Sequence, residues 1–414
     1  MTDRCGETAM GGLLVDVAAP TGDGGRRQAT ARLPRPSGPY PIGTTALHLT
    51  DTGREDPWRP GHRRELMVSL WYPTGRPATG EERARYMTPA AGAHFGGDDG
   101  AARLNYGVRP GSTDWAAIRT HARRDAPARP GDPRPVVLYS PGLGDPRSWG
   151  TALVEDLASR GYVVVTVDHT HEASEVAFPD GRLATSVFPA LLRRPGPDTG
   201  AVLRRSLRTR VDDTRFVLDE LSGLRRRPGL PTGLGGSPDL DRVGMVGHSA
   251  GGSTALQAMH DDPRIAAGIN LDGRLHLPGP DGRTGVLLPG LARNGLDRPF
   301  LLMGSRNPDS GSHHRQPGWE ALRRHSTGWC ADLTLEGSRH GSHTDASSLL
   351  PQLARQGAIG ADALAGDLGD VHPDRAELAT RCYVASFFDR WLRGHDDHLL
   401  DGPSARFPEM TYER

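Results

Sequence analysis

Apolar runs that alternate with amphipathic stretches constrain the fold of this chain more than any other feature. The runs "PVVLYS" (residues 135–140) and "YVVVTVDH" (162–169) are continuously apolar and β-branched, as strands buried on both faces are. Between them, "WGTALVEDLASRG" (149–161) has the apolar spacing of an amphipathic helix. Further runs of the first kind lie at residues 241–249, 264–272, 298–305 and 330–337. The pattern predicts an α/β fold with a mostly parallel central sheet and helices on both faces.

The flanking regions predict the domain organisation. Residues 44–51 and 63–73 alternate as strands do, and the Asp-Pro-rich piece between them fits a hairpin connection. Residues 1–38 are rich in Gly, Arg, Ala and Pro without apolar periodicity, and we expect a flexible N-terminal tail there. Residues 39–414 are expected to form one domain, which ends in a packing helix over residues 375–394.

Composition limits the partners and the location of the protein. Lys and Arg together number 50, as do Asp and Glu, so no charge excess favours nucleic acid or an anionic membrane surface. All 50 cations are arginine, which indicates a bacterial source of high genomic GC. The first twenty residues lack a signal peptide pattern, and no apolar window suits a transmembrane segment. With three widely spaced cysteines in no metal-like pattern, a cytoplasmic location is expected.

The clearest chemical motif is Gly-His-Ser-Ala-Gly at residues 247–251. It follows the apolar run "VGMV" and precedes the helical pattern "STALQAMH", the strand–turn–helix setting of a nucleophile elbow. Gly247 and Gly251 allow strand and helix to approach closely while Ser249 sits in a strained turn with its hydroxyl exposed. The alternative is a tight turn with an ordinary surface serine. The setting favours Ser249 as a nucleophile.

A nucleophilic serine needs a histidine that takes its proton and an acid that orients the histidine. In α/β-hydrolases these follow the serine in the order acid, then histidine. His340 comes just after a predicted strand and is the expected base, with His343 as its rival. For the acid, Asp272 ends the run "IAAGINLD" and Asp309 follows "FLLMGSRNPD". Position alone leaves both acids open.

Four other histidines are candidates for different roles. His313 and His314 lie in a polar segment and are expected to be solvated surface groups, because no cysteine or carboxylate spacing supports metal ligation. His169 and His171 follow a predicted strand, where they either line the pocket or serve the structure.

These segments together resemble the plasma-type platelet-activating-factor acetylhydrolase family of serine esterases, in particular its bacterial members. The resemblance covers most of residues 34–414. It is carried by "GPYPIGTTALHL", "RELMVSLWYP", "YSPGLGDPRSWG", "GYVVVTVDH", "RVGMVGHSAGGST", "GINLDG", "GSRHGSHTD" and "FFDRWLRG". The family's acid falls on Asp272 and its histidine on His340. His343 stands where relatives often carry an aromatic residue, so the resemblance implies that it lies behind the catalytic histidine.

The resemblance also implies an oxyanion hole made of two backbone amides. One is that of Ala250, directly after the nucleophile, and the other is that of Leu143, in a turn after an early strand. The family's His-Gly-Leu-Gly turn reads Pro-Gly-Leu-Gly here, with Pro141 in the place of histidine. Proline lacks its own N–H but leaves that of Leu143, so the hole can form while the local hydrogen bonding changes.

The expected activity is that of a serine esterase that cleaves a small-molecule carboxylic ester through an acyl-enzyme. A single α/β-hydrolase catalytic domain over residues 39–414 would carry it, without metal or organic cofactor. The alternative is an acyltransferase or cyclase of specialised metabolism, in which the same triad passes the acyl group to an amine or hydroxyl. A binding protein without chemistry is a third reading, which the complete Ser-Asp-His set disfavours.

A long connection between a predicted strand and helix, residues 172–205, is expected to form a cap or lid. Such connections usually take a few residues. Its apolar "VFPALL" beside an arginine cluster suits the shielding of an acyl chain near Ser249. The alternative is a surface excursion without a role.

Overall fold

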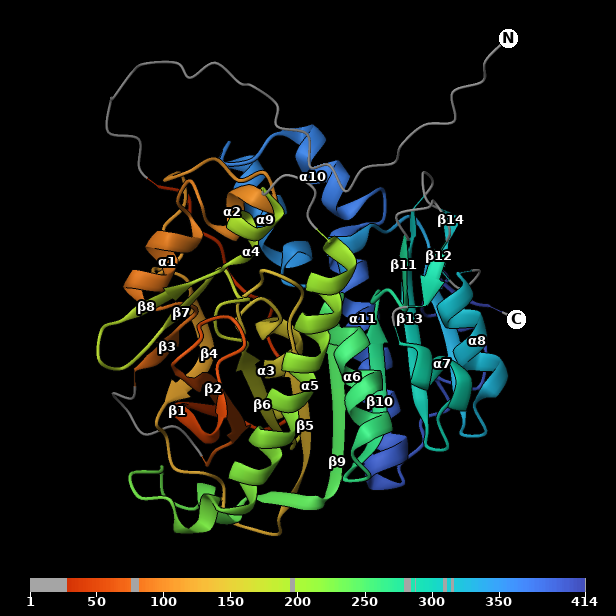
Figure 1. Cartoon of the computed structure of the whole chain (residues 1–414), viewed down its shortest axis with the longest axis horizontal. Helices are drawn as coiled ribbons and strands as arrows, with labels where there is room; N and C mark the ends of the chain where they lie inside the picture. The colour runs from red at the N-terminus through yellow and green to blue at the C-terminus, as the bar shows by residue number, and fades with distance from the viewer. Residues whose placement is uncertain are drawn as a thin grey trace.

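The fold is organised around one large, twisted sheet (Figure 1). The computed structural model of the chain describes residues 28–75, 82–193, 198–278, 284–286, 288–307, 311–313 and 316–413. Within these residues the sheet has twelve strands. They are β1 (Ile42–Glu55), β2 (Arg63–Pro73), β3 (Arg83–Arg85), β4 (Arg119–Arg124), β5 (Arg134–Ser140), β6 (Val163–Asp168), β9 (Pro238–His248), β10 (Ile265–Leu271), β13 (Phe300–Asn307), β14 (Gly311–Ser312), β15 (Cys330–Leu335) and β16 (Met410–Tyr412).

The strand order is β16-β15-β13-β10-β9-β5-β6-β2-β1-β4-β3, with β14 beside β13. The six neighbours from β15 to β6 run parallel. β1 and β2 form a long antiparallel pair in which Leu49 lies opposite Leu66. The predicted parallel centre and the predicted antiparallel pair are both confirmed. Because parallel strands share one carboxyl edge, the loops after β9, β10 and β15 meet there.

Helices cover both faces of the sheet (Figure 1). The main ones are α3 (Thr151–Ser159), α5 (Thr199–Ser222), α6 (Ala250–Asp261), α7 (Pro289–Asn294), α8 (Pro317–His325) and α11 (Pro373–Arg393). Successive side chains of a strand point to opposite faces. Accordingly, Val136 and Leu138 of β5 pack with α5 and α6, whereas Val137 and Tyr139 pack with α3 and α11. The predicted C-terminal packing helix is confirmed as α11.

Part of the predicted flexible tail is packed against the domain, so the prediction is wrong for residues 28–38. Ala29, Ala31 and Leu33 are buried against helix α9 (Ala346–Arg355). The side chains of Gln352 and Gln356 hydrogen-bond to the backbone of this segment. The buried residues alternate with exposed polar ones only over residues 28–33, a run too short to stand out in a segment rich in Gly, Arg and Pro. Residues 1–27 lie outside the described residues.

The segment 172–205 contains the hairpin β7 (Glu175–Ala177) and β8 (Leu183–Thr185), the short helix α4 (Phe188–Leu192) and the start of α5. Residues 194–197 lie outside the described residues. Phe188 packs edge-on against Trp58, with ring centroids 5.4 Å apart. Glu175 and Ala177 line a cavity of about 470 Å³, whose described walls include none of the expected catalytic residues. A lid role for this segment stays a prediction.

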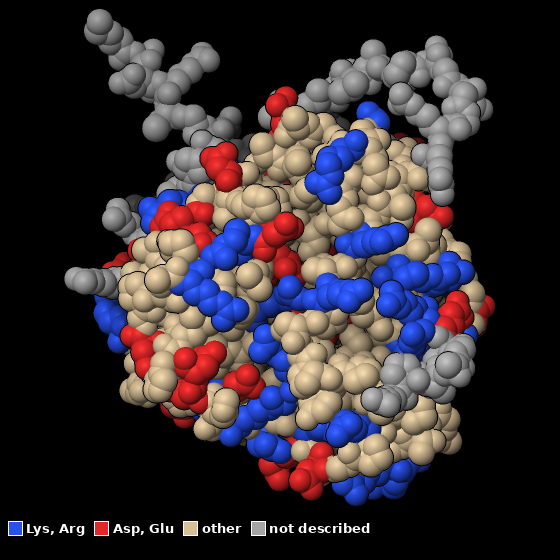
Figure 2. All heavy atoms as spheres, turned by 180° about the vertical axis from the view of Figure 1, so that it is seen from behind, with Lys and Arg blue, Asp and Glu red and all other residues tan. Residues whose placement is uncertain are grey.

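The surface carries both signs of charge. Figure 2 shows basic side chains spread over the face opposite to that of Figure 1, with acidic ones near many of them. Since the chain contains no lysine, these basic side chains are all arginine. Among the helices that the structure describes, none is long and apolar enough to cross a membrane.

Candidate active site

The Gly-His-Ser-Ala-Gly motif forms a sharp turn from β9 into α6. Ser249 has φ 55° and ψ −121°, a conformation that non-glycine residues rarely adopt. An added Cβ on Gly247 would lie 2.2 Å from the carbonyl carbon of Gly251, and one on Gly251 would lie 1.9 Å from the carbonyl oxygen of Ser140. Both glycines are therefore needed for the close approach of strand and helix.

The side chains of Ser249, His340 and Asp272 meet at the carboxyl edge of the sheet. His340 Nε2 lies 2.9 Å from Ser249 Oγ, and His340 Nδ1 lies 2.5 Å from Asp272 Oδ2. An ionised carboxylate only accepts hydrogen bonds, so Nδ1 carries the proton and Nε2 accepts from the serine hydroxyl. The rival acid, Asp309, lies outside the described residues.

Asp272 is held by the neighbouring strand as well as by His340. It follows β10 directly, with φ 55°. The backbone N–H of Ser305 in β13 donates to Oδ1 at 2.8 Å, and the Ser305 hydroxyl donates to Oδ2 at 2.9 Å. These two bonds fix the plane of the carboxylate. Sequence reasoning missed Ser305, and its place near the end of an adjacent predicted strand was the available signal.

The pKa values of this pair reflect mutual stabilisation. Burial raises the pKa of the Asp272 carboxyl, but the hydrogen bond and charge of His340 outweigh it and leave the pKa below its usual range. Burial lowers the pKa of His340, but the hydrogen bond and charge of Asp272 outweigh it and leave the pKa above 6.5. The His340 side chain is still 54 % exposed, so solvent and substrate can reach the imidazole. A solvent-accessible, strengthened base beside a serine suits proton transfer.

The expectation that His313 is a solvated surface group is wrong. The residue is 8 % exposed, and its ring packs on Trp319 with centroids 4.2 Å apart. Its Nδ1 lies 2.9 Å from the carbonyl oxygen of Ser305 and 3.9 Å from Asp272 Oδ1. An added Cβ on Gly304 would lie 1.5 Å from the ring, so this glycine makes room for the histidine. His314 lies outside the described residues.

His343 lies behind the candidate base and does not contact Ser249 among the described interactions. Its Nδ1 is 3.1 Å from Thr380 Oγ1. Burial lowers the pKa of His343 to about 4, so the ring is neutral at neutral pH. His171 is half-buried and bonds to the carbonyl oxygen of Thr185.

His248, within the motif itself, supports His340 from a second side. Its Nε2 donates to the backbone carbonyl oxygen of His340 at 2.8 Å, and the two rings are in contact with centroids 4.5 Å apart and planes tilted by 43°. Burial holds the pKa of His248 well below 6.5, so this contact adds no positive charge beside the base. The Gly-His-Ser-Ala-Gly motif by itself did not predict that His248 would bond to His340.

Two backbone amides next to the elbow are free to bind a ligand oxygen. Among the described residues, the N–H groups of Leu143 and Ala250 donate to no protein acceptor. Ala250 begins α6, where the first N–H groups have no partner within the helix. The turn that carries Leu143 packs on the same helix, because an added Cβ on Gly251 would lie 2.7 Å from the Pro141 carbonyl oxygen. Unpaired donors near a nucleophile can stabilise a developing oxyanion.

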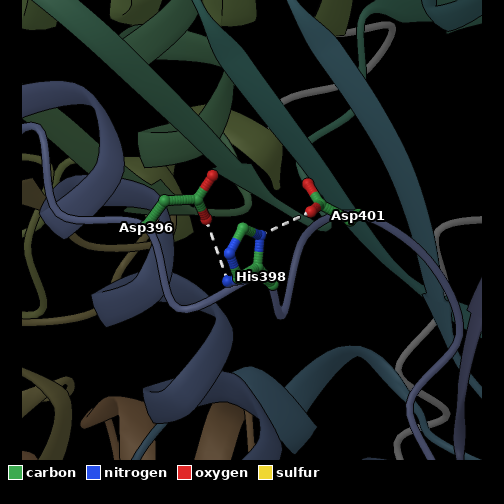
Figure 3. A group of neighbouring side chains, drawn as sticks. All are labelled: Asp396, His398 and Asp401. Carbon is green, nitrogen blue, oxygen red and sulfur yellow. Dashed lines mark hydrogen bonds and ion pairs between the residues drawn. The ribbon is translucent and has the colours of Figure 1, made fainter.

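One cluster among the described residues has side chains of the kind that bind metals. Asp396, His398 and Asp401 lie in an exposed loop after α11 (Figure 3). His398 Nδ1 lies 2.8 Å from Asp401 Oδ2. Arg390 pairs with Asp396 at 3.3 Å and with Asp401 at 2.9 Å. Because both carboxylates already pair with Arg390, the cluster is better described as an ion-pair network.

The chain is similar in sequence and fold to several known esterases. The family model described as platelet-activating factor acetylhydrolase, isoform II, matches residues 26–181. The chain is 30 % identical over 398 residues to a probable 1-alkyl-2-acetylglycerophosphocholine esterase of Arthroderma benhamiae, covering 92 % of this chain and 93 % of that protein. It is 27 % identical over 282 residues to a platelet-activating factor acetylhydrolase of Cavia porcellus, covering 62 % and 59 %. A solved ferulic acid esterase from Streptomyces cinnamoneus is 38 % identical, with a TM-score of 0.72, covering 93 % of this chain and 99 % of that one.

Proposed function

The chain belongs to the platelet-activating-factor acetylhydrolase family of carboxylic ester hydrolases, with an α/β-hydrolase fold, and we propose that it cleaves esters through an acyl-enzyme on Ser249. His340 is the general base and acid, and Asp272 is the acid of the triad. The amides of Leu143 and Ala250 form the oxyanion hole.

The reaction runs in two matched halves. Ser249 Oγ attacks the carbonyl carbon of the ester while its proton passes to His340 Nε2 over the 2.9 Å contact. The carbonyl oxygen becomes an oxyanion that accepts hydrogen bonds from Leu143 and Ala250. As the tetrahedral intermediate collapses, His340 returns the proton to the leaving alcohol. Water then attacks the acyl-enzyme by the same steps and releases the acid and free serine.

The observation that carries this proposal is the hydrogen-bond chain from Asp272 through His340 to a serine in a strained turn. A serine of ordinary structural role has no need of a φ of 55° or of a basic imidazole within hydrogen-bond distance. The substrate class follows from the relatives' names. One is named for an acetyl ester of a glycerophosphocholine and another for esters of ferulic acid, so the shared chemistry is a carboxylic ester of a small acyl group.

A fluorophosphonate probe tests the nucleophile directly. We expect it to modify the native protein at Ser249, located by peptide mass spectrometry, because the probe reacts with serines activated by a base. Ser249→Ala should abolish the labelling. Ser253→Ala is the matched control, since Ser253 lies one turn further along α6 and its buried hydroxyl bonds to the carbonyl oxygen of Arg274. Labelling that persists in Ser249→Ala, or that is absent from the folded native protein, would contradict the proposal.

A panel of esters then measures the substrate preference. It contains an acetylated glycerophosphocholine, a ferulate ester and 4-nitrophenyl esters of increasing acyl length. We expect hydrolysis of at least the small acyl esters by the native protein and none by Ser249→Ala. Equal hydrolysis by both proteins would contradict the assignment.

A further inference from the structure

A buried arginine on α5 hydrogen-bonds to the turn that contains Leu143, whose backbone amide is a candidate donor to the oxyanion. Arg210 is 1 % exposed. Its Nη1 donates to the carbonyl oxygen of Pro141 at 2.7 Å, and its Nη2 donates to that of Gly142 at 3.2 Å. The third nitrogen, Nε, donates to the buried Glu172 at 2.6 Å. The N–H groups of one planar guanidinium thus donate to two consecutive backbone carbonyls and to one carboxylate.

The hydrogen bond from Arg210 to the Gly142 carbonyl oxygen fixes the direction of the Leu143 N–H. The Gly142 carbonyl and the Leu143 N–H belong to one planar peptide, in which the two groups point in opposite directions when the peptide is trans. Because Arg210 draws the Gly142 oxygen toward α5, the Leu143 N–H is turned to the opposite side of the turn. The turn itself rests on the start of α6 beside Ser249, as the close approach of Gly251 to Ser140 and Pro141 shows.

The residue before this turn is anchored by a second Ser-His-Asp arrangement. Ser140 Oγ lies 2.9 Å from His169 Nε2, and His169 Nδ1 lies 2.9 Å from Asp213 Oδ2. Asp213 is in turn paired with the buried Arg64 at 2.6 Å. Ser140, His169 and Asp213 are at most 1 % exposed, so no substrate reaches them. Burial lowers the pKa of His169, which fits a neutral ring that accepts from the serine and donates to Asp213.

We propose that Arg210 is a positioning residue that orients the Leu143 amide for the oxyanion, and that the buried Ser140, His169 and Asp213 set anchors the strand end before it. The inference rests on the proposed function of Leu143. It also explains how the turn is fixed with a proline at position 141. Pro141 has no N–H to donate, so the turn is fixed by hydrogen bonds that its carbonyl oxygens accept from Arg210.

The choice of arginine follows from geometry. A lysine ammonium is a compact point charge on a flexible stem and cannot present the same planar fork to both carbonyls and to Glu172. Arg210→Lys therefore keeps the positive charge beside Glu172 but loses the orientation of the peptide. Ser140→Ala loosens the anchor while leaving volume and charge nearly unchanged.

Two variants of the full chain test the proposal, Arg210→Lys and Ser140→Ala. The matched control is Arg381→Lys. Arg381 is likewise buried, pairs with Glu377 and donates to the carbonyl oxygen of Arg35, but it makes no described contact with residues 141–143.

The readouts separate orientation of the oxyanion hole from a general loss of structure. We measure kcat and KM for an acetyl ester, inhibition by a boronic acid that forms a tetrahedral adduct, and the melting temperature. For Arg210→Lys we expect kcat to fall roughly 10- to 100-fold, because displacing an oxyanion donor acts on the transition state. KM should change little, and boronic acid inhibition should weaken in parallel with kcat. Ser140→Ala should show the same pattern to a smaller extent.

Two results would overturn the inference. One is a kcat in folded Arg210→Lys and Ser140→Ala as high as in Arg381→Lys. The other is a loss of activity that follows the loss of folded protein, with boronic acid inhibition unchanged in the folded fraction.

Fluorophosphonate labelling distinguishes failure of this inference from failure of the proposed function. Absence of labelling at Ser249 in the native protein removes the proposed function and this inference together, whereas normal labelling with unchanged kcat in the variants removes this inference alone.

Discussion

Replacing Asp272 with asparagine changes one atom and should disable the base without removing it. In the native site Asp272 accepts from the Ser305 N–H, the Ser305 hydroxyl and His340 Nδ1. In Asp272→Asn the amide oxygen stays on the Ser305 N–H, and the amide NH₂ then faces His340. An NH₂ group donates, so Nδ1 must become the acceptor and the imidazole proton moves to Nε2. With its proton on Nε2, His340 cannot take the proton of Ser249.

The expected loss is large. A wrong histidine tautomer in a Ser-His-Asp triad lowers kcat by about 10⁴-fold, with the geometry of the site otherwise intact. At about 1.36 kcal/mol for each factor of ten, this corresponds to about 5.4 kcal/mol of transition-state stabilisation. KM should change far less, because the carboxylate does not touch the substrate.

The assay is steady-state hydrolysis of a 4-nitrophenyl acetyl ester, with circular dichroism and melting temperature to show that the variant is folded. Asp309→Asn is the matched comparison, since Asp309 is the rival acid of the sequence. We expect Asp309→Asn to keep nearly native kcat. A folded Asp272→Asn with nearly native kcat, together with a severe loss in Asp309→Asn, would refute the reasoning and move the triad acid to the later strand.

Two further predictions concern pH and the segment 172–205. Because His340 must be neutral to act as a base and the Asp272 carboxylate raises its pKa, kcat/KM should rise with pH through a midpoint above 6.5. The residual activity of Asp272→Asn should show a lower midpoint, since the negative charge that favours the imidazolium is gone; a pH–rate profile with the same midpoint for both proteins would contradict this. Shortening the chain within residues 176–193, which leaves Glu172, the partner of Arg210, in place, should change the preference among acyl lengths and spare turnover of an acetyl ester. Identical chain-length profiles for the native and shortened, folded proteins would leave the lid reading without support.

Local patterns predicted the architecture because they are set by neighbours along the chain. Continuous apolar strands such as residues 135–140 have to be covered on both faces, and that requirement already implies helices on both sides of a parallel sheet. The elbow is equally local. Gly247 and Gly251 flank Ser249 within one motif, and the space that they leave is needed whatever the rest of the fold does.

Contacts between residues far apart in the chain could not be predicted from the sequence. The polar residues around His313 in the sequence predicted exposure to solvent. In the fold, its ring packs on Trp319 and fills the space that Gly304 leaves, so it is buried beside Asp272. The small apolar residues Ala29 and Ala31 lie in too short an alternating run to predict a buried segment. Their burial against α9 depends on a helix more than three hundred positions away.

The sequence by itself predicted the parallel sheet, the elbow and the candidate serine and histidine, because strand patterns, the spacing of small residues and motif order are properties of short segments. It left Asp272 and Asp309 open as the acid, and only the family resemblance favoured Asp272. Only the tertiary structure decided how these groups are held. Arg210 reaches Pro141 across 69 positions and Ser305 reaches Asp272 across 33, through contacts that form when strands and helices pack. No periodicity encodes such contacts, because hydrogen-bond geometry depends on where several elements lie relative to one another and not on any one of them.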